Sequence, residues 1–340
     1  MLSAEHTLKL SGLLAKKKNI VITTHTNPDG DAIGSSLGLY NFLLLKKHKV
    51  TVITPNEYPQ FLKWMQGSDK VLPYDTNTKK CDKIIAAADI VFCLDYNSLS
   101  RIDELQNPVK EAKGFKVLID HHLQPHNFCD IIFSDTKACS TCQMIFELIE
   151  GMGEKEMLNQ TISNCLYTGI MTDTGSFRFD STTSTTHRIV AELIDAGAQK
   201  TFIHQQVYDT NSEDRMRLLG YCLNHKLTVL RDFKTAFISL SSEDLERFHH
   251  EKGDTEGFVN YALSLEGIRF AAFFMERNDE VKISFRSKSH FDANTFAREN
   301  FNGGGHFNAA GAKSDLSLDE TLSKFIELLP KYKDKLTAKE

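Results

Sequence analysis

Three potential metal ligands, His25, Asp29 and Asp31, fall within seven residues near the start of the chain. They follow the apolar run 19–23, which predicts a buried strand, and they precede 32–45, which predicts a helix. A proline and a glycine punctuate the loop between strand and helix. Open α/β sheets place their functional sites at such strand ends. We therefore expect a parallel α/β sheet with a metal-binding loop after its first strand; the alternative is a polar turn whose aspartate caps the next helix.

Two later apolar runs end in the same way. The run 90–94 stops at Asp95, and the run 115–119 stops at an Asp-His-His triplet, 120–122. If these strands are parallel, their carboxyl ends share one edge of the sheet, and the polar residues meet there. A buried strand has little reason to end in a bare carboxylate unless a cation lies nearby. Asp173 lies at the end of an apolar helix, where the helix dipole disfavours a carboxylate, so it also indicates a nearby cation.

Six candidate ligands follow from this pattern. They are His25, Asp29, Asp31, Asp95, His121 and Asp173. Two imidazoles and four carboxylates suit two divalent ions that share a bridging carboxylate, and manganese, iron or zinc fits this donor set better than calcium. Ions about 3.5–4 Å apart can hold a bridging hydroxide and clamp the attacking and leaving oxygens of an in-line displacement at phosphorus. The set predicts metal-dependent phosphoryl chemistry.

The length of 340 residues favours about two domains, at roughly 150 residues each. Residues 1–197 read as the parallel-sheet domain with flanking helices, 198–226 as a helical linker, and 227–340 as a smaller α/β domain with a mixed sheet. Expected strands near and within that domain are 226–230, 235–240, 268–275 and 281–285, with helices 242–250, 257–265, 292–301 and 318–332. Asn278 and Asp279 predict a hairpin turn between the last two strands.

The second domain carries groups suited to an anion. Three consecutive glycines, 303–305, precede His306, and Arg286 with Ser287 follows a strand. Glycines let backbone amides approach a ligand closely, and amides turned into a concavity bind anions. Arg286 can fork a phosphate or carboxylate, and His306 can add a donor. A flexible turn would also explain the glycines; together with the arginine and histidine, they predict a substrate clamp made by Arg286, Ser287, Gly303, Gly304, Gly305 and His306.

Bulk properties exclude several classes of protein. The net charge of −5 argues against a general nucleic-acid coat, which needs a broad basic surface. No apolar run reaches the length of a membrane span, and the first residues do not form a secretory signal. Seven scattered cysteines suit a reducing cytoplasm. A lone CxxC, 139–142, is weak support for zinc or redox work, so packing at a helix start is the expected role.

The ordered motifs resemble a known family. The run 25–35, the strand end at Asp95, the triplet 120–122 and the segment 172–174 resemble the four motifs of the DHH phosphoesterase family. The glycine run with its histidine, and Ala-Ala-Gly at 309–311, is similar to the DHH-associated C-terminal domain. Size and layout are similar to the nanoRNase branch, which also dephosphorylates 3′-phosphoadenosine 5′-phosphate (pAp). The resemblance covers nearly the whole chain.

The resemblance implies roles for individual residues. His25, Asp29 and Asp95 would hold one manganese ion. Asp31, Asp95, His121 and Asp173 would hold the other, so Asp95 would bridge the two. Asp120 would orient its neighbours, and His122 would face the scissile phosphate. Apart from the resemblance, Arg178 follows a candidate ligand closely in the sequence and could stabilise phosphoryl charge, unless it forms a salt bridge with Asp180 or another acid. Residues 96–98 depart from the family's usual Thr or Ser followed by Asp, which could change contacts near the bridge.

These features predict a cytoplasmic, manganese-dependent phosphoesterase. It would hydrolyse short oligoribonucleotides and dinucleotides to nucleoside monophosphates, and pAp to AMP, through attack of a metal-bridged hydroxide. Alternative substrates are pyrophosphate or polyphosphate, and cyclic or linear signalling dinucleotides. A non-catalytic nucleotide-binding protein would lack ligands that are all present here. A homodimer through the first domain or the linker helices stays open.

Overall fold

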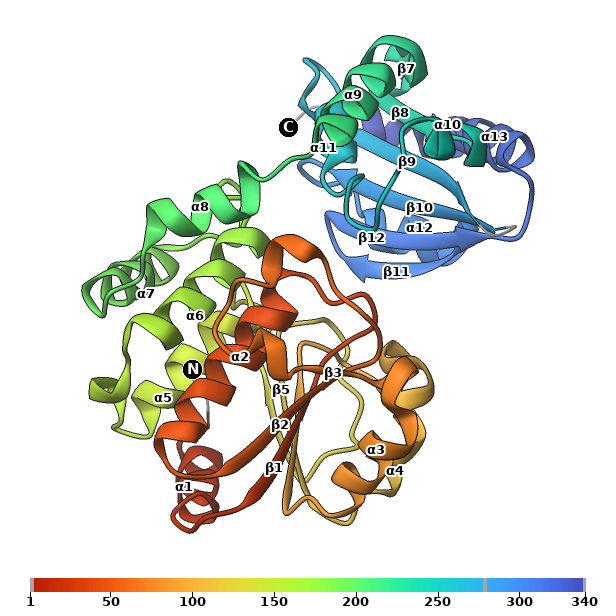
Figure 1. Ribbon diagram of the computed structural model, residues 1–340. Helices are drawn as coiled ribbons and strands as arrows, with labels where there is room; N and C mark the ends of the chain where they lie inside the picture. Colours follow the sequence, from red (N-terminus) through yellow and green to blue (C-terminus); the bar gives the residue numbers. More distant parts are fainter. Residues whose placement is uncertain (1–2, 278–279, 339–340) are drawn as a thin grey trace. The chain divides into compact units, whose positions relative to one another are not determined.

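The computed structural model of the chain describes residues 3–277 and 280–338, so the expected turn at Asn278 and Asp279 lies outside the described residues. Contacts divide the chain into two compact units, Met1–Thr210 and Asn211–Glu340 (Figure 1). The boundary falls inside the segment 198–226. Helix α8 (Lys200–Tyr208) packs on helix α6 (Gln160–Asp173) of the first unit, whereas α9 (Glu213–Tyr221) belongs to the second.

A parallel sheet of six strands, counted over the described residues, forms the centre of the first unit in the order β3-β2-β1-β4-β5-β6. The strands are β1 (Asn19–Thr23), β2 (Lys49–Thr54), β3 (Leu72–Pro73), β4 (Ile90–Leu94), β5 (Phe115–Asp120) and β6 (Ile131–Ser134). Because β1, β4 and β5 are adjacent and parallel, their carboxyl ends share one edge, as predicted. The two-residue strand β3 was not predicted from the sequence.

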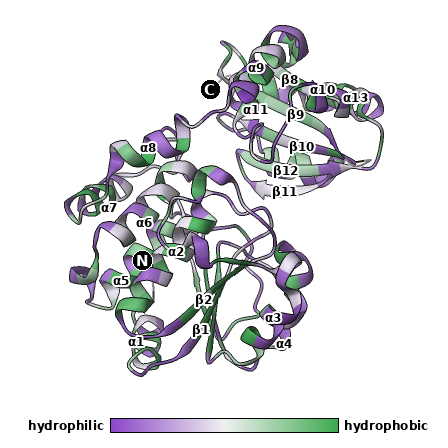
Figure 2. Cartoon of the chain, in the orientation of Figure 1, coloured by the Kyte–Doolittle hydropathy of each residue, from purple (hydrophilic) through white to green (hydrophobic). Residues whose placement is uncertain are grey.

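Alternating side chains bury both faces of this sheet. Ile20 and Ile22 of β1 belong to a core with helices on one face, and Val21 belongs to a second core on the other. Figure 2 shows β1 and β2 as mostly hydrophobic, as expected for strands covered on both sides. The first core is covered by α1 (Ala4–Leu13), α2 (Gly30–Leu45), α5 (Thr141–Gly151), α6 (Gln160–Asp173) and α7 (Ser184–Asp195), the second by α3 (Tyr74–Ala86) and α4 (Gln106–Glu111).

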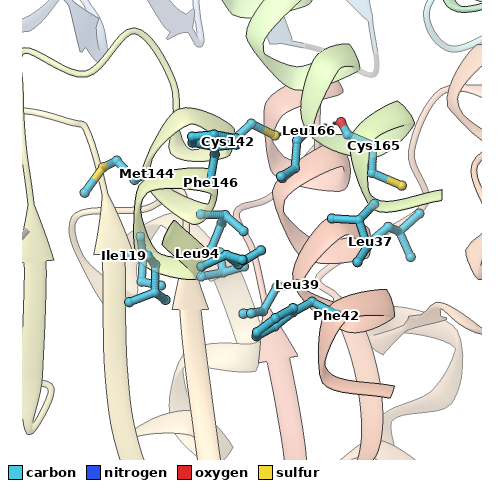
Figure 3. Close-up of a cluster of buried hydrophobic side chains, with 14 of the residues drawn as sticks. Leu37, Leu39, Phe42, Leu94, Ile119, Cys142, Met144, Phe146, Cys165 and Leu166 are labelled. Atoms are coloured by element: carbon cyan, nitrogen blue, oxygen red, sulfur yellow. Dashed lines mark hydrogen bonds between the residues drawn. The ribbon is translucent and has the colours of Figure 1, made fainter. Parts of the chain in front are cut away.

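Helices α2 and α6 pack unusually closely next to the predicted metal loop. A Cβ atom added to Gly34 of α2 would lie 2.6 Å from the carbonyl oxygen of Cys165 on α6, and one added to Gly169 of α6 would lie 2.8 Å from Oδ1 of Asp31. Glycine is therefore required at both positions by the close approach of the two backbones. Figure 3 shows the buried cluster around this contact, with side chains such as Leu37 and Leu166.

The second unit contains a mixed sheet with the strand order β11-β12-β10-β9-β8-β7, again over the described residues. Its strands are β7 (Leu227–Leu230), β8 (Thr235–Leu240), β9 (Phe270–Arg277), β10 (Glu280–Ser287), β11 (Asn302–His306) and β12 (Ala309–Ser314). Among the described strand pairs of this second sheet, only β8–β9 is parallel, and the others are antiparallel. The mixed sheet expected from the sequence is confirmed.

Helices cover this sheet from two sides. Phe270, Phe285 and Phe296 belong to a phenylalanine-rich core with α12 (Ala293–Asn300) and α13 (Leu318–Thr337). Ile238 and Phe273 belong to another core, together with α9, α10 (Ser242–Arg247) and α11 (Phe258–Ser264). Along β10 every second residue is buried, so Arg286 lies on the opposite side from Phe285.

Two local expectations need correction. The glycine run does not form a concave loop, because Gly303–Gly305 lie in strand β11 and pair with β12. A run of glycines has no alternation of apolar and polar side chains, so no strand could be predicted there from the sequence. The sequence around Trp64 also predicts a short helix, but in the described chain Trp64 lies between 3-10 turns at Gln60–Leu62 and Ser68–Lys70.

The N-terminal sequence predicts a helix that ends in the lysines at 16–18. Helix α1 ends earlier, at Leu13, so these lysines follow the helix. Across the part of the chain that the structure describes, every helix is too short or too polar to cross a membrane.

Candidate metal centre

The loop after β1 positions the first candidate ligands. Asp29 is the N-cap of α2: its Oδ1 accepts hydrogen bonds from the backbone N–H groups of Asp31 and Ala32, both at 3.0 Å. Its other oxygen, Oδ2, lies 3.8 Å from Nε2 of His25. The capping role and the ligand role considered for this stretch are therefore compatible, since each uses a different oxygen of the same carboxylate.

His25 is held with one nitrogen directed at the carboxylates. Its Nδ1 lies 2.9 Å from the carbonyl oxygen of Thr26, so a proton on Nδ1 leaves the lone pair of Nε2 available. Nε2 lies 3.4 Å from Oδ2 of Asp95. His25, Asp29 and Asp95 thus form one group of ligand atoms, all within 4.8 Å of one another.

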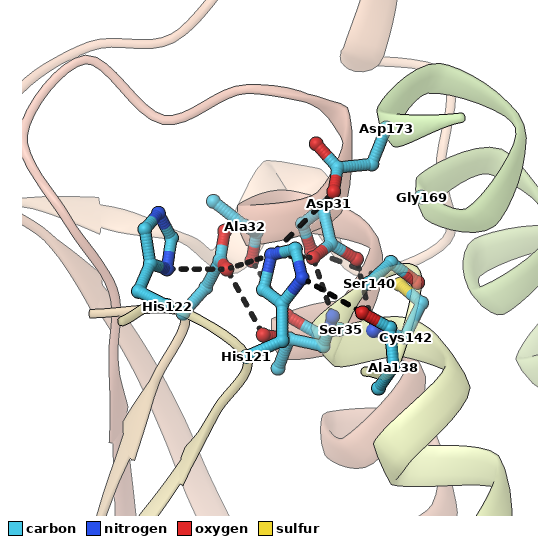
Figure 4. A network of polar contacts seen from close by, with 12 residues as sticks. Asp31, Ala32, Ser35, His121, His122, Ala138, Ser140, Cys142, Gly169 and Asp173 are labelled. Atoms are coloured by element: carbon cyan, nitrogen blue, oxygen red, sulfur yellow. Dashed lines mark hydrogen bonds and ion pairs between the residues drawn. The ribbon is translucent and has the colours of Figure 1, made fainter. Parts of the chain in front are cut away.

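His121 forms the centre of a second group. Its Nε2 lies 3.4 Å from Oδ2 of Asp173, 3.5 Å from Oδ1 of Asp95 and 3.8 Å from Oδ2 of Asp31 (Figure 4). Its Nδ1 lies 3.3 Å from the carbonyl oxygen of Ala138. As at His25, a backbone carbonyl fixes the ring so that Nε2 is directed at the carboxylates.

Asp95 contributes to both groups through different oxygens. Oδ2 faces His25, and Oδ1 faces His121. The hydroxyl of Thr141 also donates a hydrogen bond of 2.9 Å to Oδ1. The backbone of Asp95 has φ of +63°, a left-handed conformation that aspartate tolerates better than most residues. This geometry matches a carboxylate that bridges two cations.

The CxxC segment supports Asp31. The backbone N–H groups of Thr141 and Cys142, at the start of α5, donate to the two oxygens of Asp31 at 2.6 and 2.9 Å. Ser140 caps the same helix. Cys139 and Cys142 are buried free thiols, in line with the expected packing at a helix start. The segment therefore holds a carboxylate through its backbone.

Crowding of buried carboxylates perturbs the acid–base properties of the site. Burial raises the pKa of Asp31 well above its usual range, and the charges of Asp95 and Asp173 raise it further. Burial alone would raise the pKa of Asp95, but hydrogen bonds with His121 and His25 hold it well below its usual range. Burial lowers the pKa of His121, but Asp95 and Asp173 outweigh this effect and raise it well above 6.5. The cluster favours bound positive charge.

The donor set fits divalent metal ions. Donors at about 2.0–2.2 Å from one ion lie roughly 3–3.5 Å apart, and the shortest distances between histidine nitrogens and carboxylate oxygens here are 3.4 and 3.5 Å. Imidazole with carboxylates suits manganese, iron or zinc. The two groups, sharing Asp95, could hold two ions.

Asp120 and His122 form a buried pair beside the ligands. Nδ1 of His122 lies 2.8 Å from Oδ1 of Asp120, whose side chain is fully buried. The other oxygen of Asp120 has no hydrogen-bond partner among the described atoms. The carboxylate therefore fixes the orientation of the His122 ring through Nδ1.

The two arginines near this edge differ in their surroundings. Arg178 is exposed, and its Nε donates to the carbonyl oxygen of Gly175 at 2.7 Å, so no described contact joins it to the ligands. Sequence reasoning missed Arg101, whose carbonyl oxygen accepts the N–H of Thr26 at 2.8 Å. Its one sequence signal was its position six residues after Asp95.

In the second unit, Arg286 and His306 lie on one surface. Both are in register with Ala309 of β12, one on each side, so their side chains leave the same face of the sheet. Ser287 is engaged internally, because its hydroxyl donates to the carbonyl oxygen of Phe291 at 2.6 Å. The N–H of Gly305 donates to Asn294 at 2.8 Å. The residues in register with Arg286 on the two neighbouring strands, Ala309 and Ala271, are small.

Comparison with known proteins agrees with this architecture. Residues 19–170 match the DHH family, N-terminal domain, and residues 238–333 match the DHHA1 domain. The chain is 32% identical over 317 residues to a bifunctional oligoribonuclease and PAP phosphatase of Thermus thermophilus, covering 93% of this chain and 90% of that protein. A protein with the same description from Bacillus subtilis is 31% identical, with coverage of 88% and 90%.

A solved structure extends the comparison to the whole fold. The crystal structure of an exopolyphosphatase-related protein from Bacteroides fragilis superimposes with a TM-score of 0.95 at 43% identity, covering 99% of this chain and 98% of that one. The chain belongs to the DHH family. We therefore class it as a DHH-family phosphoesterase.

Proposed function

We propose that this protein is a manganese-dependent phosphoesterase that hydrolyses very short oligoribonucleotides to nucleoside monophosphates and dephosphorylates pAp to AMP. The observation that carries the proposal is the position of Asp95 between two groups of ligand atoms, with one oxygen directed at each histidine. In this proposal the first domain performs the chemistry and the second binds the substrate.

The ligands divide as the distances suggest. His25, Asp29 and Asp95 would hold one ion, and Asp31, Asp95, His121 and Asp173 the other. Two bound divalent ions would activate a water and neutralise charge on the phosphoryl group. Manganese is our choice among the metals that this donor set accommodates.

Other residues of the chain would position the substrate. Asp120 orients the ring of His122 by accepting from Nδ1–H, and an Nε2–H of the doubly protonated ring would donate to a phosphoryl oxygen. Arg286 and His306 would bind a second phosphate or the base end, with Ser287 and Gly303–Gly305 shaping that surface. Arg178, which is exposed and lies five residues after Asp173 in the sequence, would help to neutralise phosphoryl charge.

The choice of substrate rests on charge and on the relatives. A net charge of −5 does not suit a long basic groove for polymeric RNA, whereas a short anion needs only a few cationic groups. The Thermus and Bacillus relatives are described as oligoribonuclease and PAP phosphatase. The Bacteroides protein is described as exopolyphosphatase-related, which makes polyphosphate the second candidate.

Cellular context follows from thiol chemistry. All seven cysteines are free, which supports a reducing cytoplasm. We also propose a homodimer through the first domain or the linker helices, to be checked by the molar mass in solution.

Side-by-side rates with Mn²⁺ test the function. The substrates are pAp, a 5′-phosphorylated dinucleotide, a long RNA, a linear signalling dinucleotide, pyrophosphate and polyphosphate. We expect fast turnover of pAp and dinucleotide and slow turnover of long RNA. Fast hydrolysis of polyphosphate, with no cleavage of pAp or the dinucleotide, would contradict the proposal and favour polyphosphate as the substrate.

A further inference from the structure

Arg101 is fixed at the edge of the sheet that carries the ligands. It lies in the 3-10 segment Leu99–Leu105, which follows Asp95 after a short loop. Its carbonyl oxygen accepts the N–H of Thr26, the residue after His25, at 2.8 Å. This hydrogen bond joins the loop after β4 to the loop after β1.

The segment before Arg101 is tied to a third loop at the same edge. The side-chain amide of Asn97 donates to the carbonyl oxygen of Leu123 at 2.7 Å, and the N–H of His126 donates to the carbonyl oxygen of Asn97 at 2.7 Å. Leu123 directly follows the DHH triplet. The backbone of Arg101 is therefore held relative to residues on both sides of the ligand groups.

Arg101 is partly buried. No ion pair links its side chain to any described carboxylate, although Asp29 and Asp95 lie close to His25. Its charge acts on the ring of His25, so the side chain lies on the His25 side of the ligand groups. A partly buried cation without a protein counter-ion favours an anion from outside the protein.

We propose that Arg101 binds a phosphate group of the substrate on the His25 side of the ligand groups. The inference rests on the proposed phosphoesterase function and adds a cation that the first unit itself supplies. A guanidinium can donate two parallel hydrogen bonds to a phosphate, so it would fix the orientation of the phosphate as well as its charge. Arg101 suits this role better than Arg178, whose Nε already donates to its own loop.

Three variants test the role of Arg101. Arg101→Ala removes the cation, Arg101→Lys keeps the charge without the planar fork, and Arg188→Ala is a matched control. Arg188 is exposed on α7 and bonds only Ser184 and Thr185 among the described residues. For each folded variant we would measure the Kd of inorganic phosphate by calorimetry with Mn²⁺ present, the Kd of Mn²⁺, and KM and kcat for pAp.

We expect Arg101→Ala to weaken phosphate binding and raise KM about 10- to 100-fold, the effect of losing charge-assisted hydrogen bonds. Arg101→Lys should recover part of this loss. The Kd of Mn²⁺ should match that of Arg188→Ala. Unchanged phosphate affinity in Arg101→Ala would overturn the proposal, and so would an equal loss of Mn²⁺ binding, which would indicate a purely structural role.

The phosphate measurement separates this inference from the proposed function. If the wild-type protein binds phosphate through Arg101 but does not turn over pAp or dinucleotides, the proposed function fails and the inference stands. If turnover occurs and Arg101→Ala matches the control, the inference fails alone. If Arg101→Ala does not fold, Arg101→Lys is the deciding variant. Phosphate affinity and a KM for pAp that both equal the wild-type values would overturn the proposed bidentate contact.

Discussion

The candidate ligands of the first unit lie at one edge of its parallel sheet, which we call the ligand edge. They differ in burial and anchoring from Arg286 and His306, which lie on the β10–β12–β11 surface of the second unit. At the ligand edge every candidate group is buried or anchored, and a backbone carbonyl fixes the orientation of both His25 and His121. On the second surface, Arg286 and His306 stand beside glycine and alanine and are only partly buried. The groups at the ligand edge are thus held by many contacts, whereas Arg286 and His306 are more accessible.

This difference shows where the chemistry is most sensitive to change. A bridging carboxylate must keep both oxygens in place, and Asp95 is fixed by its backbone, by Thr141 and by two histidines. A substrate-binding arginine can lose one contact and leave the reacting atoms undisturbed. Variants at the ligand edge should therefore lower kcat, and variants on the second surface should raise KM.

The largest effect is expected for Asp95→Asn. Asparagine also tolerates the left-handed conformation at this position, so the substitution removes charge without backbone strain. Turnover of pAp should fall about 1000-fold or more, because several kcal/mol of charge stabilisation are lost. Asp195→Asn, at the exposed end of α7, is the control. If Asp95→Asn kept a turnover rate within tenfold of the control, Asp95 would not be a ligand needed for the reaction.

A smaller effect is expected for Asp120→Asn. The neutral side chain weakens the hold on Nδ1 of His122 but keeps the shape of the pair. We expect kcat to fall about 10- to 100-fold with little change in KM, since a group that orients a neighbour is lost. Steady-state kinetics and a thermal unfolding curve check this. A rise in KM at constant kcat would instead indicate that Asp120 acts in substrate binding.

Arg286→Ala tests the second surface. KM for pAp should rise about tenfold while kcat stays within about twofold, because a charge-assisted hydrogen bond to the substrate is removed. Arg217→Ala is the matched control, since Arg217 is exposed on α9 and pairs with Glu213. Unchanged kinetic constants would remove Arg286 from the substrate surface.

The smallest effect concerns pH. Burial and neighbouring carboxylates raise the pKa of Asp31, and Asp95 and Asp173 raise that of His121 in spite of burial. The metal-free folded protein therefore keeps protons that the unfolded chain releases, on Asp31 above pH 3.8 and on His121 above pH 6.5. The stability from these protons is lost as pH rises.

Bound Mn²⁺ replaces these protons, so its effect on Tm should grow with pH. We expect the increase to be about 2–4 °C per pH unit for each displaced proton between about pH 6 and about pH 8. Differential scanning calorimetry with and without Mn²⁺ measures it, and Arg286→Ala should behave like the wild-type protein. A metal effect that is independent of pH would indicate that ligand protonation does not compete with binding.

The two units also differ in how much of their structure could be predicted from the sequence. In the first unit, the apolar runs that end in Asp95 and at the triplet 120–122 were enough to predict that these polar residues meet, because parallel strands bring their carboxyl ends to one edge. The hold of Thr141 on Asp31 could not be predicted, since it joins residues 110 positions apart. Nor could the positive φ of Asp95, which only its tertiary contacts maintain.

In the second unit the sequence predicted the helices and four strands but missed β11 and β12. Strand β11 exists because it pairs with β12, and its glycines have no intrinsic preference for a strand. Arg101 was missed for a related reason, because its closeness to His25 depends on a hydrogen bond between two loops. Residues whose role depends on loop contacts escape a reading based on periodicity.

The central claim is that two cations share Asp95. Crystals soaked in Mn²⁺ and measured near the manganese absorption edge test it directly. The account predicts two anomalous peaks about 3.5–4 Å apart, with one oxygen of Asp95 on each, His25 on the first and His121 on the second. A single peak, or two peaks with Asp95 bound to neither or only one, would contradict it.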